Sequence, residues 1–177
     1  MKEIRYFFAK VRTKFSKHKK ETICEYFRRS GMHIGKGCNI CCNIMTSEPY
    51  LIEIGNNVTI SGNVTFVTHD NCVCKLFGNG NDLYGKIHIG DNCFIGMNSS
   101  IMYGVNLPAS VIVGCGSVVT SSPEREGVVI AGNPARVIGD IDDFRHKFKD
   151  KVIYTGDCSV KKKRKKVLSE SGKWIEK

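Results

Sequence analysis

The aliphatic residues in the middle of the chain recur every six positions. The ladder, within residues 87–138, comprises Ile89, Ile95, Ile101, Leu107, Val113 and Val119. Small or apolar residues stand four positions further on, at Cys93, Ser99, Val105, Val111 and Ser117. A period of six fits neither the helical period of 3.6 nor a long alternating strand. It predicts a coil of short strands, each of which turns after about six residues and points one aliphatic side chain inwards.

Three such strands would close a triangular coil of about 18 residues, and stacked coils would bury a continuous aliphatic column. The same phase occurs nearer the N-terminus at Ile34, Ile40, Ile54, Ile60 and Phe66. The spacing from Phe66 to Ile89 is 23 residues, longer than one coil, and the intervening segment is rich in Gly and Asn. We therefore predict a β domain over residues 32–139, from which a loop at 70–86 projects. Loops on a rigid scaffold often carry function.

Helical patterns flank this domain. In the basic segment 1–31, an apolar stripe is formed by Ile4, Phe7, Phe8, Val11 and Phe15. Such a stripe packs against the protein's own body, which is the commoner case, or lies on a membrane surface. Residues 140–156 show a second stripe and are expected to form a helix that caps the coil. The polar and basic residues 157–177 are expected to be disordered.

Charge and cysteine content indicate which partners and which cellular compartment to expect. The formal net charge is +10, and the basic run 161–166 contributes six of it. The basicity is therefore mainly a property of the tail, and it predicts no specific nucleic-acid partner. No stretch is long and apolar enough to be a signal peptide or to span a bilayer. The nine cysteines are odd in number and suit reduced thiols in the cytoplasm. The pairs Cys38/Cys41 and Cys72/Cys74 lack the spacing of known zinc fingers, and no metal is expected.

Several motifs occur in a characteristic order along the chain. They are residues 47–55, Thr68-His69-Asp70, residues 95–99, residues 114–120 and residues 132–136. In content and order they resemble the hexapeptide-repeat acyltransferases, and in particular the O-acetyltransferases of capsular and other surface polysaccharides. The resemblance covers roughly residues 32–139. It implies a left-handed parallel β-helix, a homotrimer, acetyl-CoA as the acyl donor and a carbohydrate hydroxyl as the acceptor.

The resemblance assigns His69 as the general base. A sugar hydroxyl is a poor nucleophile, whereas a thioester is already activated, so the enzyme must supply a base near neutrality and orient both reactants. Imidazole titrates in that range. A carboxylate on the other ring nitrogen would fix the tautomer, and both Glu48 and Asp70 are candidates. Direct attack needs no covalent enzyme intermediate, so the cysteines are not expected to act as nucleophiles.

The resemblance also predicts the binding residues. Those expected to contact coenzyme A are Met97, Cys115, Thr120, Ser121 and Arg136. Backbone groups of Met97 and Cys115 would meet the pantetheine arm, and Arg136 would meet a phosphate. Many relatives carry Lys at the position of Ser121, so the local phosphate contact differs here. Asn43 and Cys41 lie near the place where relatives present a sugar-binding asparagine.

Other functions are compatible with parts of the pattern. The acceptor of an acetyltransferase could be another small molecule, such as serine, an amino sugar or an antibiotic. From a different class, a β-helical zinc carbonic anhydrase would need three converging histidines, here His69, His88 and His33. His33 lies several coils away in sequence, which disfavours this reading. The basic N-terminal helix and tail are also compatible with peripheral association with anionic lipid.

Overall fold

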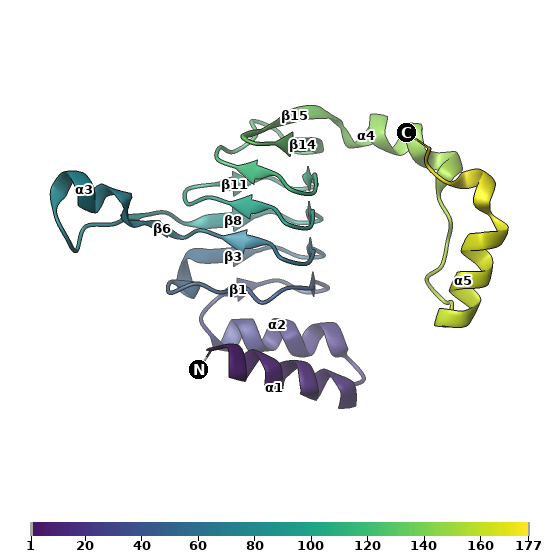
Figure 1. Cartoon of the computed structure of the whole chain (residues 1–177), viewed down its shortest axis with the longest axis horizontal. Helices are drawn as coiled ribbons and strands as arrows, with labels where there is room; N and C mark the ends of the chain where they lie inside the picture. The colour runs from purple at the N-terminus through teal and green to yellow at the C-terminus, as the bar shows by residue number, and fades with distance from the viewer. Residues whose placement is uncertain (1, 177) are drawn as a thin grey trace. The chain divides into compact units, whose positions relative to one another are not determined.

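The computed structural model describes residues 2–176, which fall into two compact units divided after Ile141. The first unit contains a stack of short parallel strands with two helices at one end, α1 (Lys2–Phe15) and α2 (Lys19–Arg29) (Figure 1). Within residues 2–176 the parallel strands form three sheets. The first consists of β1 (His33–Ile34), β3 (Ile52–Ile54), β8 (Ile87–Ile89) and β11 (Asn106–Leu107). The third consists of β5 (Thr65–Phe66), β10 (Ser100–Ile101) and β13 (Val118–Val119).

The second sheet is longer and ends in a hairpin. Its parallel strands are β2 (Asn39–Ile40), β4 (Thr59–Ile60), β9 (Phe94–Ile95), β12 (Ile112–Val113) and β14 (Val128–Gly132). The strand β15 (Ala135–Asp140) pairs antiparallel with β14 and closes the stack at the end opposite the helices (Figure 1). Successive strands, for example β8, β9 and β10, pass from the first sheet to the second and then to the third. This order is the triangular coil that the sequence predicts.

The strand register reproduces the predicted repeat. Ile89 pairs with Leu107, Ile95 with Val113 and Ile101 with Val119, so each pairing spans 18 residues. All six side chains of this ladder are fully buried. Burial of one such side chain contributes about 1.5–3 kcal/mol, and the stacked ladder is therefore the main source of stability of the coil.

The polar groups of the small inward residues form hydrogen bonds. The buried hydroxyls of Ser99 and Ser117 donate to the carbonyl of Gly114, at 3.0 and 2.7 Å. The thiols of Cys38 and Cys93 are buried and donate to carbonyls of a neighbouring coil. Such bonds remove the cost of burying a polar group. Cys38 and Cys93 therefore pack as small core residues.

An arm projects from the stack where the sequence predicts a loop (Figure 1). It leaves through β6 (His69–Asp70) and contains the short helix α3 (Cys74–Phe77). It returns through β7 (Leu83–Tyr84), which pairs antiparallel with β6. Because β6 follows β5 directly, the base of the arm lies at the corner where the third sheet leads to the first.

The predicted helical ends differ from the structure in two ways. On α1, Ile4, Phe7, Phe8 and Phe15 of the predicted stripe are exposed and Val11 is half-buried. Tyr6 and Ala9 instead face the protein core, so the expectation that the stripe packs against the body is wrong. In the second unit, the segment expected to be disordered contains helix α5 (Val160–Ser169), which Ser159 caps at its N-terminus. Lysine and arginine are good helix formers despite their charge, which explains this difference.

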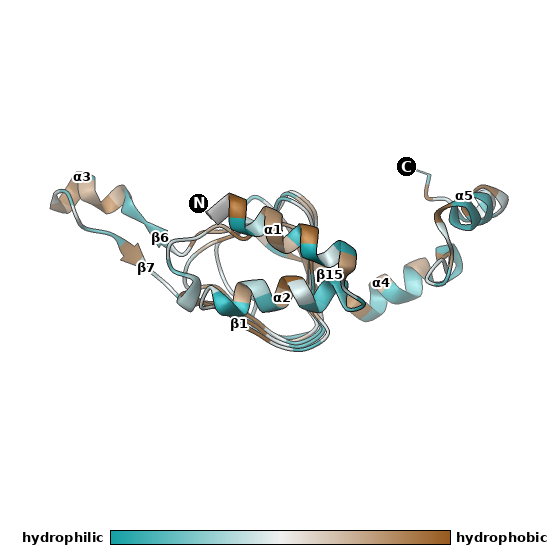
Figure 2. Ribbon diagram, turned by 90° about the horizontal axis from the view of Figure 1, so that it is seen from below, coloured by the Kyte–Doolittle hydropathy of each residue, from teal (hydrophilic) through white to brown (hydrophobic). Residues whose placement is uncertain are grey.

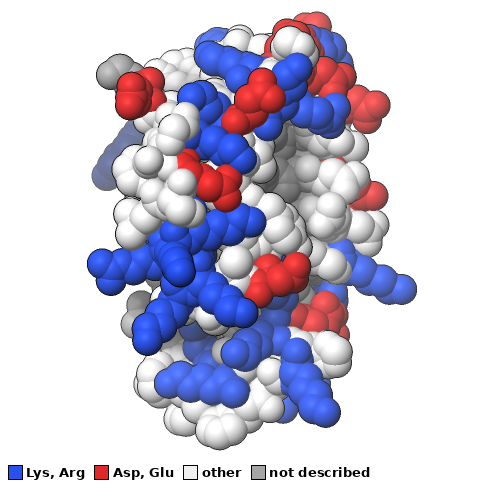
Figure 3. Space-filling model, turned by 90° about the vertical axis from the view of Figure 1, so that its right-hand side faces the viewer, with Lys and Arg blue, Asp and Glu red and all other residues white. Residues whose placement is uncertain are grey.

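The second unit contains, besides α5, most of helix α4 (Ile141–Phe148). None of the described residues of α4 is buried, so its predicted capping role stays a prediction. Helix α5 contains the basic run 161–166, and Lys and Arg side chains are numerous in the view of Figure 3. Among residues 2–176, no helix combines the length and apolarity that crossing a bilayer requires.

Candidate active site

His69 lies at the base of the arm, on strand β6. It pairs with Tyr84 of β7, and the two ring centroids are 5.9 Å apart. The His69 side chain is 40% exposed, so it is held by neighbours yet open to a ligand. The arm therefore fixes a titratable group at the surface of the rigid coil.

The structure decides between the two candidate carboxylates. The Glu48 Oε2 atom lies 2.8 Å from His69 Nδ1, and Glu48 is buried in the turn before the short 3₁₀ helix Pro49–Leu51. Asp70 instead accepts a hydrogen bond from the backbone N–H of Cys72 at 2.9 Å, which caps the first turn of the arm. Glu48 is therefore the partner of His69, and Asp70 organises the arm.

Two threonines outside the predicted set of site residues hold Glu48 in place. Thr68 donates to Glu48 Oε2 at 2.7 Å, and the Thr46 hydroxyl lies 2.6 Å from that of Thr68. Burial raises the pKa of Glu48, but the hydrogen bonds from Thr68 and His69 outweigh it, and the net shift is downward. Thr68 stands inside the Thr-His-Asp motif, which is the signal that could have identified it.

This arrangement defines what the imidazole can do. The ionised Glu48 carboxylate accepts a hydrogen bond from a protonated His69 Nδ1. The lone pair of Nε2 is then available to a ligand. The same carboxylate stabilises the imidazolium that forms when Nε2 takes a proton. The Glu48–His69 pair thus has the geometry of an oriented general base.

Three of the predicted coenzyme A residues lie along one edge of the stack, where the second sheet leads to the third. Met97 and Cys115 are 18 residues apart and occupy the same corner in neighbouring coils, joined by a hydrogen bond of 2.8 Å from Gly116 N–H to the Met97 carbonyl. Both side chains are exposed. The β14–β15 turn lies one coil further on, where the Gly132 N–H donates to Ser117, and Arg136 follows on β15.

The other two predicted residues, Thr120 and Ser121, lie along a different edge. They follow β13 at the corner where the third sheet leads to the first. This is the corner from which the arm leaves, two coils away, because β5, β10 and β13 stack in that order. In a single chain the predicted cofactor residues are thus divided between the two edges of the third sheet.

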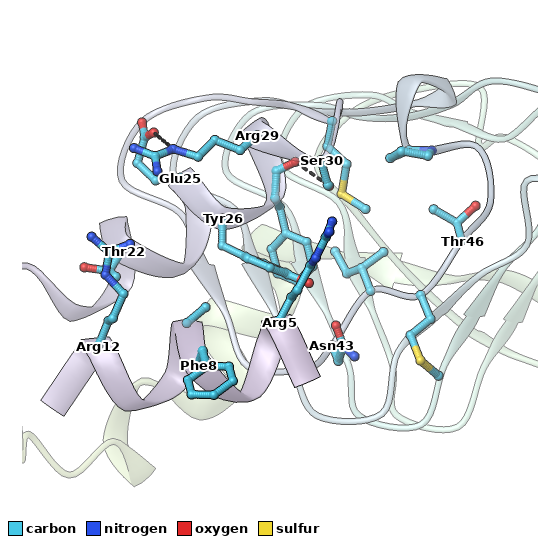
Figure 4. A pocket seen from close by; sticks show the side chains of 16 residues that line it. Arg5, Phe8, Arg12, Thr22, Glu25, Tyr26, Arg29, Ser30, Asn43 and Thr46 are labelled. Atoms are coloured by element: carbon cyan, nitrogen blue, oxygen red, sulfur yellow. Dashed lines mark hydrogen bonds and ion pairs between the residues drawn. The ribbon is translucent and has the colours of Figure 1, made fainter. Parts of the chain in front are cut away.

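The predicted acceptor residues are also separated. Asn43 lines a cavity of about 740 Å³ between α1, α2 and the segment 43–49 (Figure 4). Thr46 lines the same cavity and connects it, through Thr68, to the Glu48–His69 pair. Cys41 is exposed and accepts a hydrogen bond from the Asn39 side chain. It does not line this cavity.

The zinc alternatives find no support in the arrangement. His33 and His88 lie on the outer side of the first sheet, with Glu53 between them in register, whereas His69 lies on the arm. In the described part of the chain, no group of three or more His, Cys, Asp or Glu side chains is placed to hold a metal ion.

Comparison with known proteins agrees with the repeat and the fold. The family described as "Hexapeptide repeat of succinyl-transferase" matches residues 86–121. Protein CapG of Staphylococcus aureus is 37% identical over 148 residues, which cover 81% of this chain and 86% of CapG. The galactoside O-acetyltransferase of Escherichia coli (strain K12) is 36% identical over 132 residues, which cover 74% of this chain but only 62% of that enzyme.

A solved structure gives the same result. The crystal structure of a maltose O-acetyltransferase from Clostridium difficile 630 superposes with a TM-score of 0.55 at 25% identity, over 78% of this chain and 85% of that one. The hexapeptide repeat, together with relatives that are O-acetyltransferases, identifies the coil as an acyltransferase scaffold. The chain belongs to the hexapeptide-repeat acetyltransferase family, and it is an acyltransferase related to Protein CapG.

Proposed function

We propose that this protein is an acetyl-CoA-dependent O-acetyltransferase that acetylates a sugar hydroxyl, as part of the synthesis of a surface polysaccharide. The observation that carries the proposal is the Glu48–His69 pair at the base of the arm, with 2.8 Å between Oε2 and Nδ1. The names of the galactoside and maltose O-acetyltransferases support a carbohydrate acceptor. We also propose that the coil is left-handed, as the family resemblance implies. A cytoplasmic location is proposed as well, because it suits nine free thiols.

In the proposed reaction His69 Nε2 takes the proton of the acceptor hydroxyl as the hydroxyl oxygen attacks the thioester carbonyl. Glu48 keeps the proton-bearing Nδ1 in position and stabilises the imidazolium. When the carbon–sulfur bond breaks, His69 returns the proton to the leaving thiolate. The acetyl group moves directly from sulfur to oxygen, so no cysteine of the chain becomes acylated.

The proposed coenzyme A site uses both edges of the third sheet. Met97, Cys115 and Arg136 lie along one edge, and His69 and Ser121 lie along the other. We propose the homotrimer that the family resemblance implies, because a second copy of the chain would place the edge of one protomer beside the opposite edge of its neighbour. The exposed Arg136 guanidinium has no carboxylate partner among the described residues and suits a phosphate.

Asn43 is proposed to contact the acceptor, because the cavity that it lines is connected to Glu48 by hydrogen bonds. Cys41 is proposed as a second acceptor contact on the basis of the family resemblance alone. It lies two residues from Asn43 on an exposed part of the coil.

A transfer assay over a panel of sugars, sugar nucleotides, serine, amino sugars and aminoglycosides tests the proposal. Coenzyme A release is best followed by chromatography, since the nine cysteine thiols would react with thiol dyes. The His69→Ala variant is expected to lose about 10²- to 10⁴-fold in rate, while its circular dichroism stays that of the wild type. An unchanged rate in this variant would refute the general-base role. Transfer to serine or an aminoglycoside but to no sugar would refute the acceptor class.

A further inference from the structure

Helix α1 presents an apolar stripe to solvent. The exposed fractions are 60% for Ile4, 63% for Phe7, 60% for Phe8 and 86% for Phe15. At about 100° per residue these side chains, with Val11, fall within an arc of roughly 100° on one side of the helix. A large exposed apolar surface on a folded protein marks an interaction site.

The stripe is held outwards by the packing of the opposite face. Tyr6 and Ala9 of α1 join the core, and the Tyr6 ring lies 5.7 Å from that of Tyr26 and 5.9 Å from that of Phe27 on α2. Figure 2 shows α1 and α2 side by side, with hydrophobic residues in brown along α1. Rotation of α1 to bury the stripe would expose Tyr6 and Ala9, so the stripe is available to a partner.

Cations border the stripe on both sides. By the same angular count, Arg5 and Arg12 lie beyond one edge of the stripe, and Lys10 and Lys14 lie beyond the other. This distribution is typical of helices that lie in the interface of a bilayer, where the apolar side chains enter the acyl region and Lys and Arg reach the phosphates.

The cavity beside α1 adds a recess for an anion. Arg5 and Arg12 of α1 and Arg29 of α2 line it, together with Phe8 (Figure 4). Glu25 also lines it, but its carboxylate accepts from Arg28 at 2.9 Å and lies 3.9 Å from Arg29. Among the described residues, the side chains of Arg5 and Arg12 form no hydrogen bond or ion pair. The recess therefore carries unneutralised positive charge next to the apolar stripe.

We infer that α1 docks on an anionic bilayer, with the stripe in the acyl boundary and a lipid phosphate between Arg5, Arg12 and Arg29. The alternative occupant of the stripe is a second copy of this chain. A symmetric contact through the stripe would bring the bordering cations of the two copies together, and the cores of protein interfaces are depleted in charge. Charge complementarity favours the lipid surface. The inference is independent of the proposed acetyl transfer.

Sedimentation of the full-length protein with vesicles tests the inference. We expect binding to phosphatidylglycerol–phosphatidylcholine vesicles that weakens with salt, and little binding to phosphatidylcholine alone. The double variant Phe7→Ser/Phe15→Ser should bind the anionic vesicles at least about tenfold more weakly, because it removes apolar area from the stripe. The control is Phe77→Ser, since Phe77 is 72% exposed but lies on α3 of the arm. It should bind like the wild type.

Arg5→Gln/Arg12→Gln should also bind more weakly and show a smaller salt dependence. Equal binding to neutral and anionic vesicles, or wild-type binding by the Phe7→Ser/Phe15→Ser variant, would overturn the inference. So would a change of oligomeric state in that variant on analytical ultracentrifugation, because it would assign the stripe to a second copy. The rate of acetyl transfer to a soluble acceptor should stay unchanged in Phe7→Ser/Phe15→Ser. A protein that binds vesicles but transfers no acetyl group would refute only the proposed function.

Discussion

Replacement of Glu48 by glutamine removes the negative charge behind His69 and keeps the size of the side chain. In the wild type the Oε2 atom lies 2.8 Å from His69 Nδ1 and accepts from Thr68 at 2.7 Å. When His69 takes the acceptor proton, the Nδ1 contact becomes a hydrogen bond between two charged groups. Such bonds are worth about 1.5–3 kcal/mol, and each 1.36 kcal/mol is tenfold in rate. We therefore expect the Glu48→Gln variant to lose about 10- to 100-fold in kcat.

The division between kinetic constants distinguishes this role from a structural one. Glu48 is a positioning residue that acts through His69, so KM for the acceptor should change little while kcat falls. Initial rates at varied acceptor concentration, with coenzyme A followed by chromatography, give both constants. Circular dichroism of the variant checks that the fold is retained.

Two further variants make the test specific. Glu53→Gln is the matched control, because Glu53 lies 3.7 Å from His88 Nδ1 and pairs with Lys86 rather than with His69. It should retain wild-type kcat. Asp70→Asn keeps an acceptor for the Cys72 N–H and should cost much less than Glu48→Gln. A larger loss of kcat in Asp70→Asn than in Glu48→Gln would refute the assignment of the carboxylate.

Three other predictions follow from the same structure. Gly96→Ala should lower the melting temperature, since an added Cβ would lie 2.6 Å from the Cys115 backbone nitrogen, whereas Gly139→Ala, which meets nothing within 4 Å, should not. The lowered pKa of Glu48 means that its ionised form stabilises the fold above the unfolded pKa of about 4.3, and that this stabilisation is lost as pH falls through the lower folded pKa. The stability difference between wild type and Glu48→Gln, measured by urea unfolding, should therefore shrink as the pH falls below about 4.3. Arg136→Gln should raise KM for acetyl-CoA and leave kcat nearly unchanged, because a phosphate contact remote from the reacting carbonyl binds ground and transition states alike.

The coil is predictable because its repeat is a local rule. One aliphatic residue in every six must point inwards, and the register of Ile95 with Val113 follows from the length of a coil. The arm is predictable for the same reason, since an interval of 23 residues between Phe66 and Ile89 cannot be fitted to the repeat. What the period leaves open is the chemistry at the corners, because the outward residues obey no such rule.

The choice between Glu48 and Asp70 shows where the sequence stops being informative. Asp70 is adjacent to His69, but adjacent residues on a strand point to opposite faces, and its carboxylate meets the Cys72 N–H instead. Glu48 lies 21 residues away and reaches Nδ1 only because the coil returns the turn at 46–49 to the corner beneath the arm. Proximity in sequence would favour Asp70, whereas the stacking of coils places the Glu48 carboxylate against His69.

Helix α1 shows a second limit of prediction from sequence. Its position also bears on how the acceptor reaches the proposed active site. The spacing of Phe7, Phe8 and Phe15 establishes that the helix has an apolar face but not which face meets the protein. In the structure the small Ala9 and the ring of Tyr6 pack against the core, with the Tyr6 ring 5.9 Å from that of Phe27 on α2. The stripe is thus left for a partner, and the cavity that Arg5 lines extends to Asn43 and Thr46, next to the Glu48–His69 pair. If α1 docks on anionic lipid as inferred, the proposed acceptor side of the enzyme faces the bilayer, and an acceptor carried on a lipid phosphate would reach His69 without leaving the membrane surface.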